Sequence, residues 1–186
     1  MIKFGTDGWR AIIDQDFNEE NVSLAAQAIA GYLKEQGKSR VVIGYDIRKK
    51  ADYFAKLMAQ VMAGNGIQAY LADSPCATPA TGWNIIDKKA DGGIMLTASH
   101  NPPEFLGIKY MTGEGMVAPT EVTDAFMKNL EGLQILDVEK EDFERARKQE
   151  KIVLYDPTPG YFRKIKSLID LEKIKNSNLK IPIRAS

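Results

Sequence analysis

Val41-Val42-Ile43-Gly44-Tyr45 and Gly93-Ile94-Met95-Leu96-Thr97 are the two stretches that decide the fold of this chain. Each is a short, continuous apolar run, which is typical of a strand covered on both faces of a sheet. Apolar residues at helical spacing separate and follow these runs. Helices are expected over 22–33, 54–62 and 78–86, after 120, and over 160–176, with further strands over 68–72 and 108–111.

Strands that alternate with helices in this way predict a layered α/β domain. We expect a three-layer α/β/α fold with a mixed, mostly parallel sheet and helices on both faces. Asn18 is the expected N-cap of the first helix, and Thr78 the expected cap of the third, with Pro79 in its first turn. The charged stretch 139–151 is expected to be a solvated surface segment.

The length of 186 residues suits one domain with a tail. We expect residues 1–155 to form that domain. Residues 156–186 are expected to be a helical linker and the truncated start of a second domain, whose first strand would lie at 179–181.

Lysine and arginine number 25, and aspartate and glutamate number 25, so the formal net charge is zero. A dedicated nucleic-acid binder would be basic, so no nucleic-acid partner is expected. The single cysteine, Cys76, fits a reducing compartment. No signal-peptide pattern and no apolar stretch long enough to cross a bilayer is seen, so we expect a cytoplasmic protein without a membrane partner.

Ligands of such sheets bind beyond the carboxyl ends of the strands. The loop after the run at 93–97 is the most informative, because it presents Ser99, His100 and Asn101 before two prolines that are expected to keep it extended. Ser99 is a candidate nucleophile. The alternative is an Asn-Pro turn in which the serine and histidine only bond the backbone.

His100 is the only histidine of the chain. In an extended segment neighbouring side chains point in opposite directions, so His100 is badly placed to take a proton from Ser99. This argues against a Ser-His-Asp hydrolase. One histidine and one distant cysteine also argue against a zinc site.

Three further stretches carry polar groups of interest. Phe4-Gly5-Thr6-Asp7-Gly8-Trp9-Arg10 combines two glycines with an arginine suited to phosphate, although a simple turn is the alternative. Gly44-Tyr45-Asp46-Ile47-Arg48 ends a strand with a charged pair that could be a surface ion pair of little energetic value. Gly107-Ile108-Lys109 places a lysine shortly after the serine loop.

These stretches, in this order and spacing, resemble the amino-terminal part of the α-D-phosphohexomutases, the phosphoglucomutase/phosphomannomutase superfamily. The resemblance runs from the first residues to about Leu179. It implies that Ser99 carries a phosphoryl group, gives it to a hexose monophosphate and recovers the other phosphoryl from the resulting bisphosphate. The expected activity is therefore the interconversion of hexose 1-phosphate and hexose 6-phosphate, with a hexose phosphate as substrate.

The resemblance also implies roles for single residues. The catalytic residues would be Ser99, His100, Lys109 and Arg10. Residues that shape the site or its rim would be Thr97, Asn101, Asp7 and Arg48. Lys109 and Arg10 would neutralise charge, Lys109 would serve as the general acid or base with His100 as the second candidate, and a phosphate oxygen on Ser99 would ligate Mg²⁺.

The chain departs from the family pattern at Leu106-Gly107, where the family often has Asn-Gly. The family's three further domains, which supply the metal loop, sugar recognition and the phosphate grip, are not seen. Asp14 and Asp16 form the only close aspartate pair and are expected to face solvent. This chain is therefore expected to need the remaining domains as partners, and the alternative is a non-catalytic sugar-phosphate-binding or regulatory domain of the same fold.

Overall fold

The computed structural model describes residues 2–5, 7–177, 180 and 182. A six-stranded sheet lies at its centre, with the order β1-β5-β4-β2-β3-β6. The strands are β1 (Trp9–Ile12), β2 (Arg40–Tyr45), β3 (Gln68–Ala72), β4 (Gly92–Leu96), β5 (Phe105–Thr112) and β6 (Ile152–Tyr155). β2 pairs in parallel with β3 and β4, and β3 pairs in parallel with β6. β5 runs antiparallel to both of its neighbours, so the sheet is mixed and mostly parallel, as expected.

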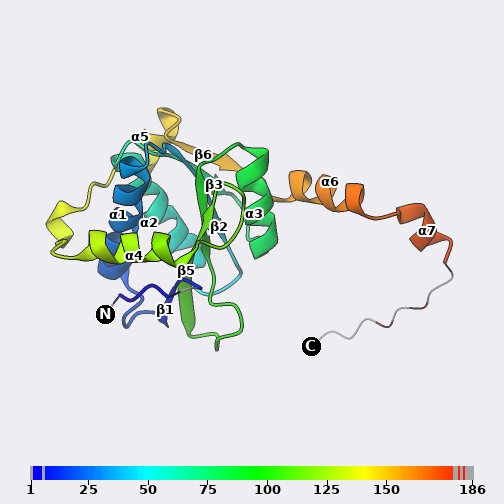
Figure 1. Ribbon diagram of the computed structural model, residues 1–186, viewed down its shortest axis with the longest axis horizontal. Coiled ribbons are helices and arrows are strands. Elements are labelled where there is room, and N and C mark those ends of the chain that lie inside the picture. The colour runs from blue at the N-terminus through cyan, green and yellow to red at the C-terminus, as the bar shows by residue number, and fades with distance from the viewer. Residues whose placement is uncertain (1, 6, 178–179, 181, 183–186) are drawn as a thin grey trace.

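Helices cover both faces of the sheet (Figure 1). One face carries α1 (Glu19–Glu35), α2 (Ala51–Gly64) and α4 (Thr120–Leu130), and the other carries α3 (Thr78–Asp87). The short helices η1 (Ile135–Asp137) and α5 (Phe143–Lys148) lead into β6. The last two helices are α6 (Thr158–Leu168) and α7 (Leu171–Lys175); α6 begins against α3, and from there the chain extends away from the body. This confirms the expected three-layer fold.

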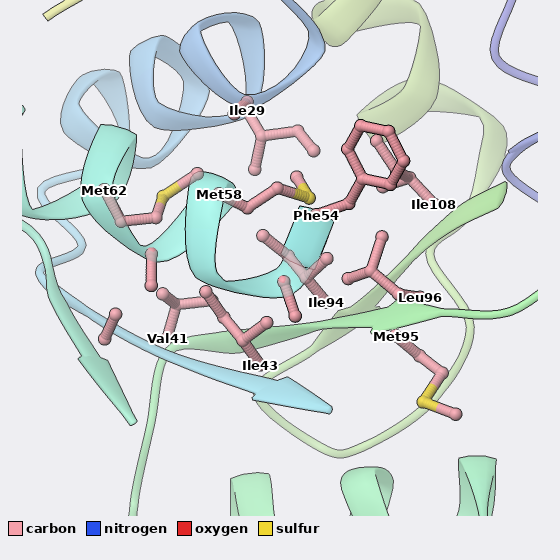
Figure 2. Close-up of a cluster of buried hydrophobic side chains, with 14 of the residues drawn as sticks. Ile29, Val41, Ile43, Phe54, Met58, Met62, Ile94, Met95, Leu96 and Ile108 are labelled. Atoms are coloured by element: carbon pink, nitrogen blue, oxygen red, sulfur yellow. The ribbon is translucent and has the colours of Figure 1, made fainter. Parts of the chain in front are cut away.

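The core explains why the two apolar runs are continuous. Ile94 and Leu96 of β4 lie under α2, whose Phe54 and Met58 point down onto the sheet (Figure 2). Met95, between them, points to the opposite face, where its sulfur accepts a hydrogen bond from Thr81 Oγ1 of α3 at 3.3 Å. Every residue of β4 is buried, so both faces of this strand require apolar side chains.

Helix starts follow the expectation in one case and depart from it in another. Asn18 caps α1, because its Oδ1 accepts from the backbone N–H of Asn21 at 2.9 Å. The predicted cap of α3 is wrong: Ala77 occupies the N-cap position without a side-chain hydrogen bond, and Thr78 is already the first helical residue. Pro79 still lies in the first turn, where its missing N–H costs nothing.

Most residues of the stretch 139–151 are exposed, as expected, but two of them are buried. Glu141 is only 7% exposed, and Ala146 of α5 is fully buried. The Glu141 carboxylate accepts hydrogen bonds from Arg145 Nε at 3.0 Å and Lys151 Nζ at 2.6 Å. Glu141 N–H donates to the carbonyl of Gln60 on α2 at 3.1 Å. Within this exposed, charged stretch the Glu141 carboxylate is buried because it is paired with two cations.

Two strands were not expected from the sequence. β1 and β6 form the two edges of the sheet, and each has only four residues. The helical region expected over 160–176 is divided into α6 and α7. Of the strand expected at 179–181, residues 179 and 181 lie outside the described part of the chain. No helix among the described residues is long and apolar enough to cross a membrane.

Candidate active site

The serine loop joins β4 to β5 at the carboxyl end of β4 and consists of residues 97–104. The expectation that it is extended is wrong, because it folds into two successive turns. Asn101 N–H donates to the carbonyl of Ala98 at 2.9 Å, and Phe105 N–H donates to that of Pro102 at 3.0 Å. The argument that neighbouring side chains point in opposite directions therefore does not apply to Ser99 and His100.

Ser99 is exposed, but its backbone is firmly held. Its φ of 52° lies in the left-handed region, which is unusual for a non-glycine residue. Its N–H donates to Oγ1 of the buried Thr97 at 3.0 Å, and Thr97 N–H donates to the carbonyl of Gly107 at 3.0 Å. The Ser99 hydroxyl has no hydrogen-bond partner among the described residues, so it is available to a ligand.

A second group of charges comes from the neighbouring strands. Asp7 accepts an ion pair from Lys109 Nζ of β5 at 2.6 Å, and its other carboxylate oxygen pairs with Arg10 of β1. Arg10 Nη1 also donates to Oδ1 of Asn101 at 2.7 Å. The side chain of Lys109 is only 11% exposed. The Asp7 carboxylate thus pairs with both Arg10 and Lys109. The hydrogen bond from Arg10 to Asn101 connects these three residues to the serine loop.

Glycines allow these strands to approach each other. Gly107 lies opposite Arg10 in the β1–β5 ladder, and a Cβ on it would lie 2.7 Å from Arg10 Cγ. Gly8 has a φ of 93°, and a Cβ there would overlap the carbonyl of Ile108. Gly8 also exchanges two main-chain hydrogen bonds with Gly5, at 3.0 and 3.1 Å, which close the turn that carries Asp7. Gly8 and Gly107 are therefore required by the close approach of these strands, whereas a Cβ on Gly5 would meet only an ordinary contact.

Arg48 reaches the serine loop from the end of β2. Its side chain is 14% exposed, and its Nε pairs with Asp46 Oδ2 at 3.4 Å. Its guanidinium donates to four main-chain carbonyls of the loop region, those of Ser99, Asn101, Pro102 and Phe105. The alternative of a weak surface ion pair is therefore wrong, and the sequence offered no signal for these carbonyl contacts.

An open hollow of about 510 Å³ lies beside the serine loop. It is lined by Asp46, Ile47, Arg48, Lys49, Ser99, Asn101 and Pro103. Of these, Ile47 and Lys49 were not among the expected site residues. His100 is exposed, does not line the hollow and has no hydrogen-bond or ion-pair partner among the described residues. Of the expected site residues, Ser99, Asn101 and Arg48 line the hollow, and Asp7, Arg10, Lys109 and Thr97 are connected to the serine loop by hydrogen bonds and ion pairs.

In the described part of the chain, the carboxylates do not form a metal site and the cysteine does not provide a second nucleophile. Among the described residues, no group of three or more His, Cys, Asp and Glu side chains could hold a metal ion. Asp7 and Asp46, whose cation partners contact the serine loop, are both ion-paired, and Glu104 of the loop is exposed. These residues do not form a Mg²⁺ site by themselves. Burial raises the pKa of the Cys76 thiol, which shares a hydrogen bond with Thr81 Oγ1, so it is a poor nucleophile.

The sequence of this chain is similar to that of known proteins of one family. Residues 1–134 match the family model "Phosphoglucomutase/phosphomannomutase, alpha/beta/alpha domain I". A phosphoglucomutase/phosphomannomutase of Thermococcus kodakarensis is 32% identical over 92% of this chain and 37% of its own length. A phosphoglucomutase of Staphylococcus saprophyticus is 31% identical over 91% of this chain and 32% of its own length.

The solved structures agree with the sequence comparisons. The crystal structure of a Thermus thermophilus protein assigned as a phosphomannomutase superposes with a TM-score of 0.83 at 31% identity, covering 93% of this chain and 37% of that one. The chain therefore spans about a third of the length of the relatives that it matches. Through its residues 1–134, the chain belongs to the phosphoglucomutase/phosphomannomutase family, whose alpha/beta/alpha domain I it contains.

Proposed function

We propose that Ser99 is the phosphoryl carrier of a phosphohexomutase that interconverts hexose 1-phosphate and hexose 6-phosphate. The observation that carries this proposal is the serine loop itself. It presents an exposed hydroxyl without a partner among the described residues, on a backbone fixed by hydrogen bonds, next to a cluster that contains Arg10 and Lys109. Phosphoryl transfer asks a protein mainly for positioning and charge neutralisation.

In the proposed reaction, a hydroxyl oxygen of the hexose monophosphate attacks the phosphorus carried by Ser99. The bond from phosphorus to Ser99 Oγ breaks as the bond to the sugar oxygen forms, and a base takes the hydroxyl proton. The hexose bisphosphate then presents its other phosphoryl group to Ser99 Oγ: the bond from phosphorus to the sugar oxygen breaks as the bond to Oγ forms, and the proton held by the base returns to that sugar oxygen. Arg10 and Lys109 balance the charge of the transferred group. We assign the proton transfer to Lys109, with His100 as the second candidate for contact with the substrate hydroxyl or phosphate.

The remaining residues support this chemistry in the proposal. Thr97 and Asn101 hold the serine loop through the hydrogen bonds described above. Asp7 holds Arg10 and Lys109 beside each other until a phosphate replaces it as their counter-ion. Since the described residues do not form a Mg²⁺ site alone, we propose that a phosphate oxygen on Ser99 is one ligand and that further domains supply the others.

We further propose that residues 1–155 form the phosphoserine-bearing domain and that residues 156–186 lead as a helical linker towards a second domain. The sheet supports this boundary, because its last strand ends at Tyr155. The choice of sugar would rest on the other domains. We place the reaction in the cytoplasm, since the single cysteine of the chain suits a reducing compartment.

The test is Ser99→Ala in a protein that contains this chain with the remaining domains. The variant should lose mutase turnover of glucose 1-phosphate or mannose 1-phosphate by at least about a thousandfold, since it removes the phosphoryl carrier. Folding should be unchanged because the side chain is exposed. Ser167→Ala, an exposed serine of α6, is the control and should keep the wild-type rate. A Ser99→Ala variant that still turns over would favour a non-catalytic sugar-phosphate-binding domain.

A further inference from the structure

The guanidinium of Arg48 donates hydrogen bonds to main-chain carbonyls in and next to the serine loop. Nη2 donates to the carbonyls of Ser99 at 3.0 Å and Asn101 at 2.8 Å. Nη1 donates to the carbonyls of Pro102 at 2.8 Å and Phe105 at 3.0 Å. A guanidinium has four N–H groups on these two nitrogens, so each of them has its own acceptor. Arg48 therefore gathers the main chain of both turns around a single planar group.

Asp46 fixes Arg48 in turn. Its Oδ1 accepts from the backbone N–H of Arg48 at 3.0 Å, and its Oδ2 faces Nε at 3.4 Å. The N–H of Asp46 donates to the carbonyl of Leu96, the last residue of β4, at 3.0 Å. The strand that precedes the serine loop is thus connected, through Asp46 and Arg48, to the far side of the same loop.

The contacts of Arg48 hold the main chain at Ser99, the proposed phosphoryl carrier. Ser99 has a φ of 52°, which a non-glycine residue keeps only when its surroundings impose it. The carbonyls of Ser99 and Asn101 share Nη2, which fixes the Ser99–His100 and Asn101–Pro102 peptide planes. We propose, on the basis of the function proposed above, that Arg48 is a positioning residue that orients Ser99 for phosphoryl transfer through these four carbonyls and does not itself act on the phosphoryl group.

Lysine cannot replace arginine in this role. Its ammonium has the same charge but carries three donors on one atom, so it cannot address four carbonyls arranged around a plane. Arg48→Lys therefore separates the positioning role from the contribution of charge. Arg40, at the exposed beginning of the same strand, provides the matched control, because no side-chain hydrogen bond or ion pair is formed by it among the described residues.

The first experiment needs no catalytic activity. Amide hydrogen exchange of this chain, followed by NMR, reports the two turns through the N–H groups of Asn101 and Phe105. Arg48→Lys should accelerate exchange at both by at least about tenfold and leave the amides of β2 and α2 unchanged, and Arg40→Lys should change neither. Unchanged protection at Asn101 and Phe105 in Arg48→Lys would overturn the proposal. If Arg48→Lys fails to fold, Asp46→Asn, which weakens the hold on Arg48, should show the same local effect, and its absence would also overturn the proposal.

The second experiment measures the consequence for transfer in a protein with the remaining domains. Arg48→Lys should lower kcat by about a hundredfold, the cost expected of a misplaced reacting group, with KM within about threefold of wild type. Free guanidinium should restore part of the turnover of Arg48→Ala, which a loss of global structure would not allow. A kcat of Arg48→Lys within about twofold of wild type would contradict the positioning role. Turnover that survives in Ser99→Ala would instead contradict the proposed function, while the exchange result would stand.

Discussion

Lys109 and Arg10 reach the same carboxylate, Asp7, from two neighbouring strands. In the proposed function this carboxylate is replaced by the transferred phosphoryl group, and Lys109 moves the proton. Lys109→Ala should therefore lower mutase turnover by roughly two to four orders of magnitude, the usual contribution of a general acid or base. Mass spectrometry should still detect phosphate on Ser99. Lys148→Ala, at an exposed lysine of α5, should keep full activity, and a wild-type rate in Lys109→Ala would remove that residue from the site.

Gly8 offers a test of the turn that carries Asp7. Its φ of 93° and the overlap of an added Cβ with Ile108 predict that Gly8→Ala destabilises the chain by about 3 kcal/mol. Gly37 is the matched control, since its φ of 64° is also positive but nothing lies within 4 Å of an added Cβ. Gly37→Ala should cost about 1 kcal/mol. Equal losses for the two variants in urea unfolding would contradict the close approach of Gly8 to β5.

At the scale of the element, the segment around α5 depends on Glu141. The hydrogen bond from Lys151, together with that from Arg145, holds the pKa of Glu141 below its ordinary value, although burial acts in the opposite direction. A carboxyl whose pKa is lower in the folded state stabilises the fold above its unfolded value of about 4.3 and loses this effect as the pH falls through the folded pKa. Glu141→Gln should therefore be less stable than wild type at pH 7, and the difference should shrink progressively as the pH falls below about 4.3.

Urea unfolding at several pH values checks this expectation. Glu144→Gln is the control, since Glu144 is exposed and pairs with Arg147 only at 3.5 Å. It should show little pH-dependent difference from wild type. A difference between Glu141→Gln and wild type that stays constant from about pH 7 to about pH 3.5 would contradict the assigned role of the carboxylate.

The elements that could be predicted are those with a strong apolar period. The buried runs of β2 and β4 and the amphipathic helices α1 and α2 each carry enough residues to be recognised. β1 and β6 were missed because four residues at the edge of a sheet show too little periodicity. The burial of Glu141 was missed because its partners Arg145 and Lys151 make the local sequence polar.

For the candidate site, the identity of several residues could be predicted from the sequence, but their backbone conformation and contacts could not. Ser99, Arg10 and Lys109 stand in stretches that the family resemblance identifies. The left-handed φ of Ser99 and the contacts of Arg48 depend on main-chain carbonyls that no side-chain pattern encodes. The hydrogen bond between Arg10 and Asn101 joins residues 91 positions apart, so only the folded chain reveals it.

At the scale of the whole molecule, α6 begins against α3, and from there the chain extends away from the body through α7 (Figure 1). Among the eleven residues of α6 only Gly160 is buried, and α7 buries none. A chain of residues 1–157 should therefore fold cooperatively, with an m-value in urea within roughly 15% of that of the whole chain, because m follows the surface exposed on unfolding. A shortened chain that does not unfold cooperatively would contradict the proposed boundary near residue 155.

The central claim is that Ser99 accepts and carries a phosphoryl group. The most direct measurement is peptide mass spectrometry of a protein that contains this chain with the remaining domains, after incubation with a hexose 1,6-bisphosphate and Mg²⁺, with Ser99→Ala treated in parallel. We expect one added phosphate, confined to the peptide that contains Ser99 and missing from the variant. Phosphate at another residue, equal labelling of the variant, or no phosphate on Ser99 would contradict it.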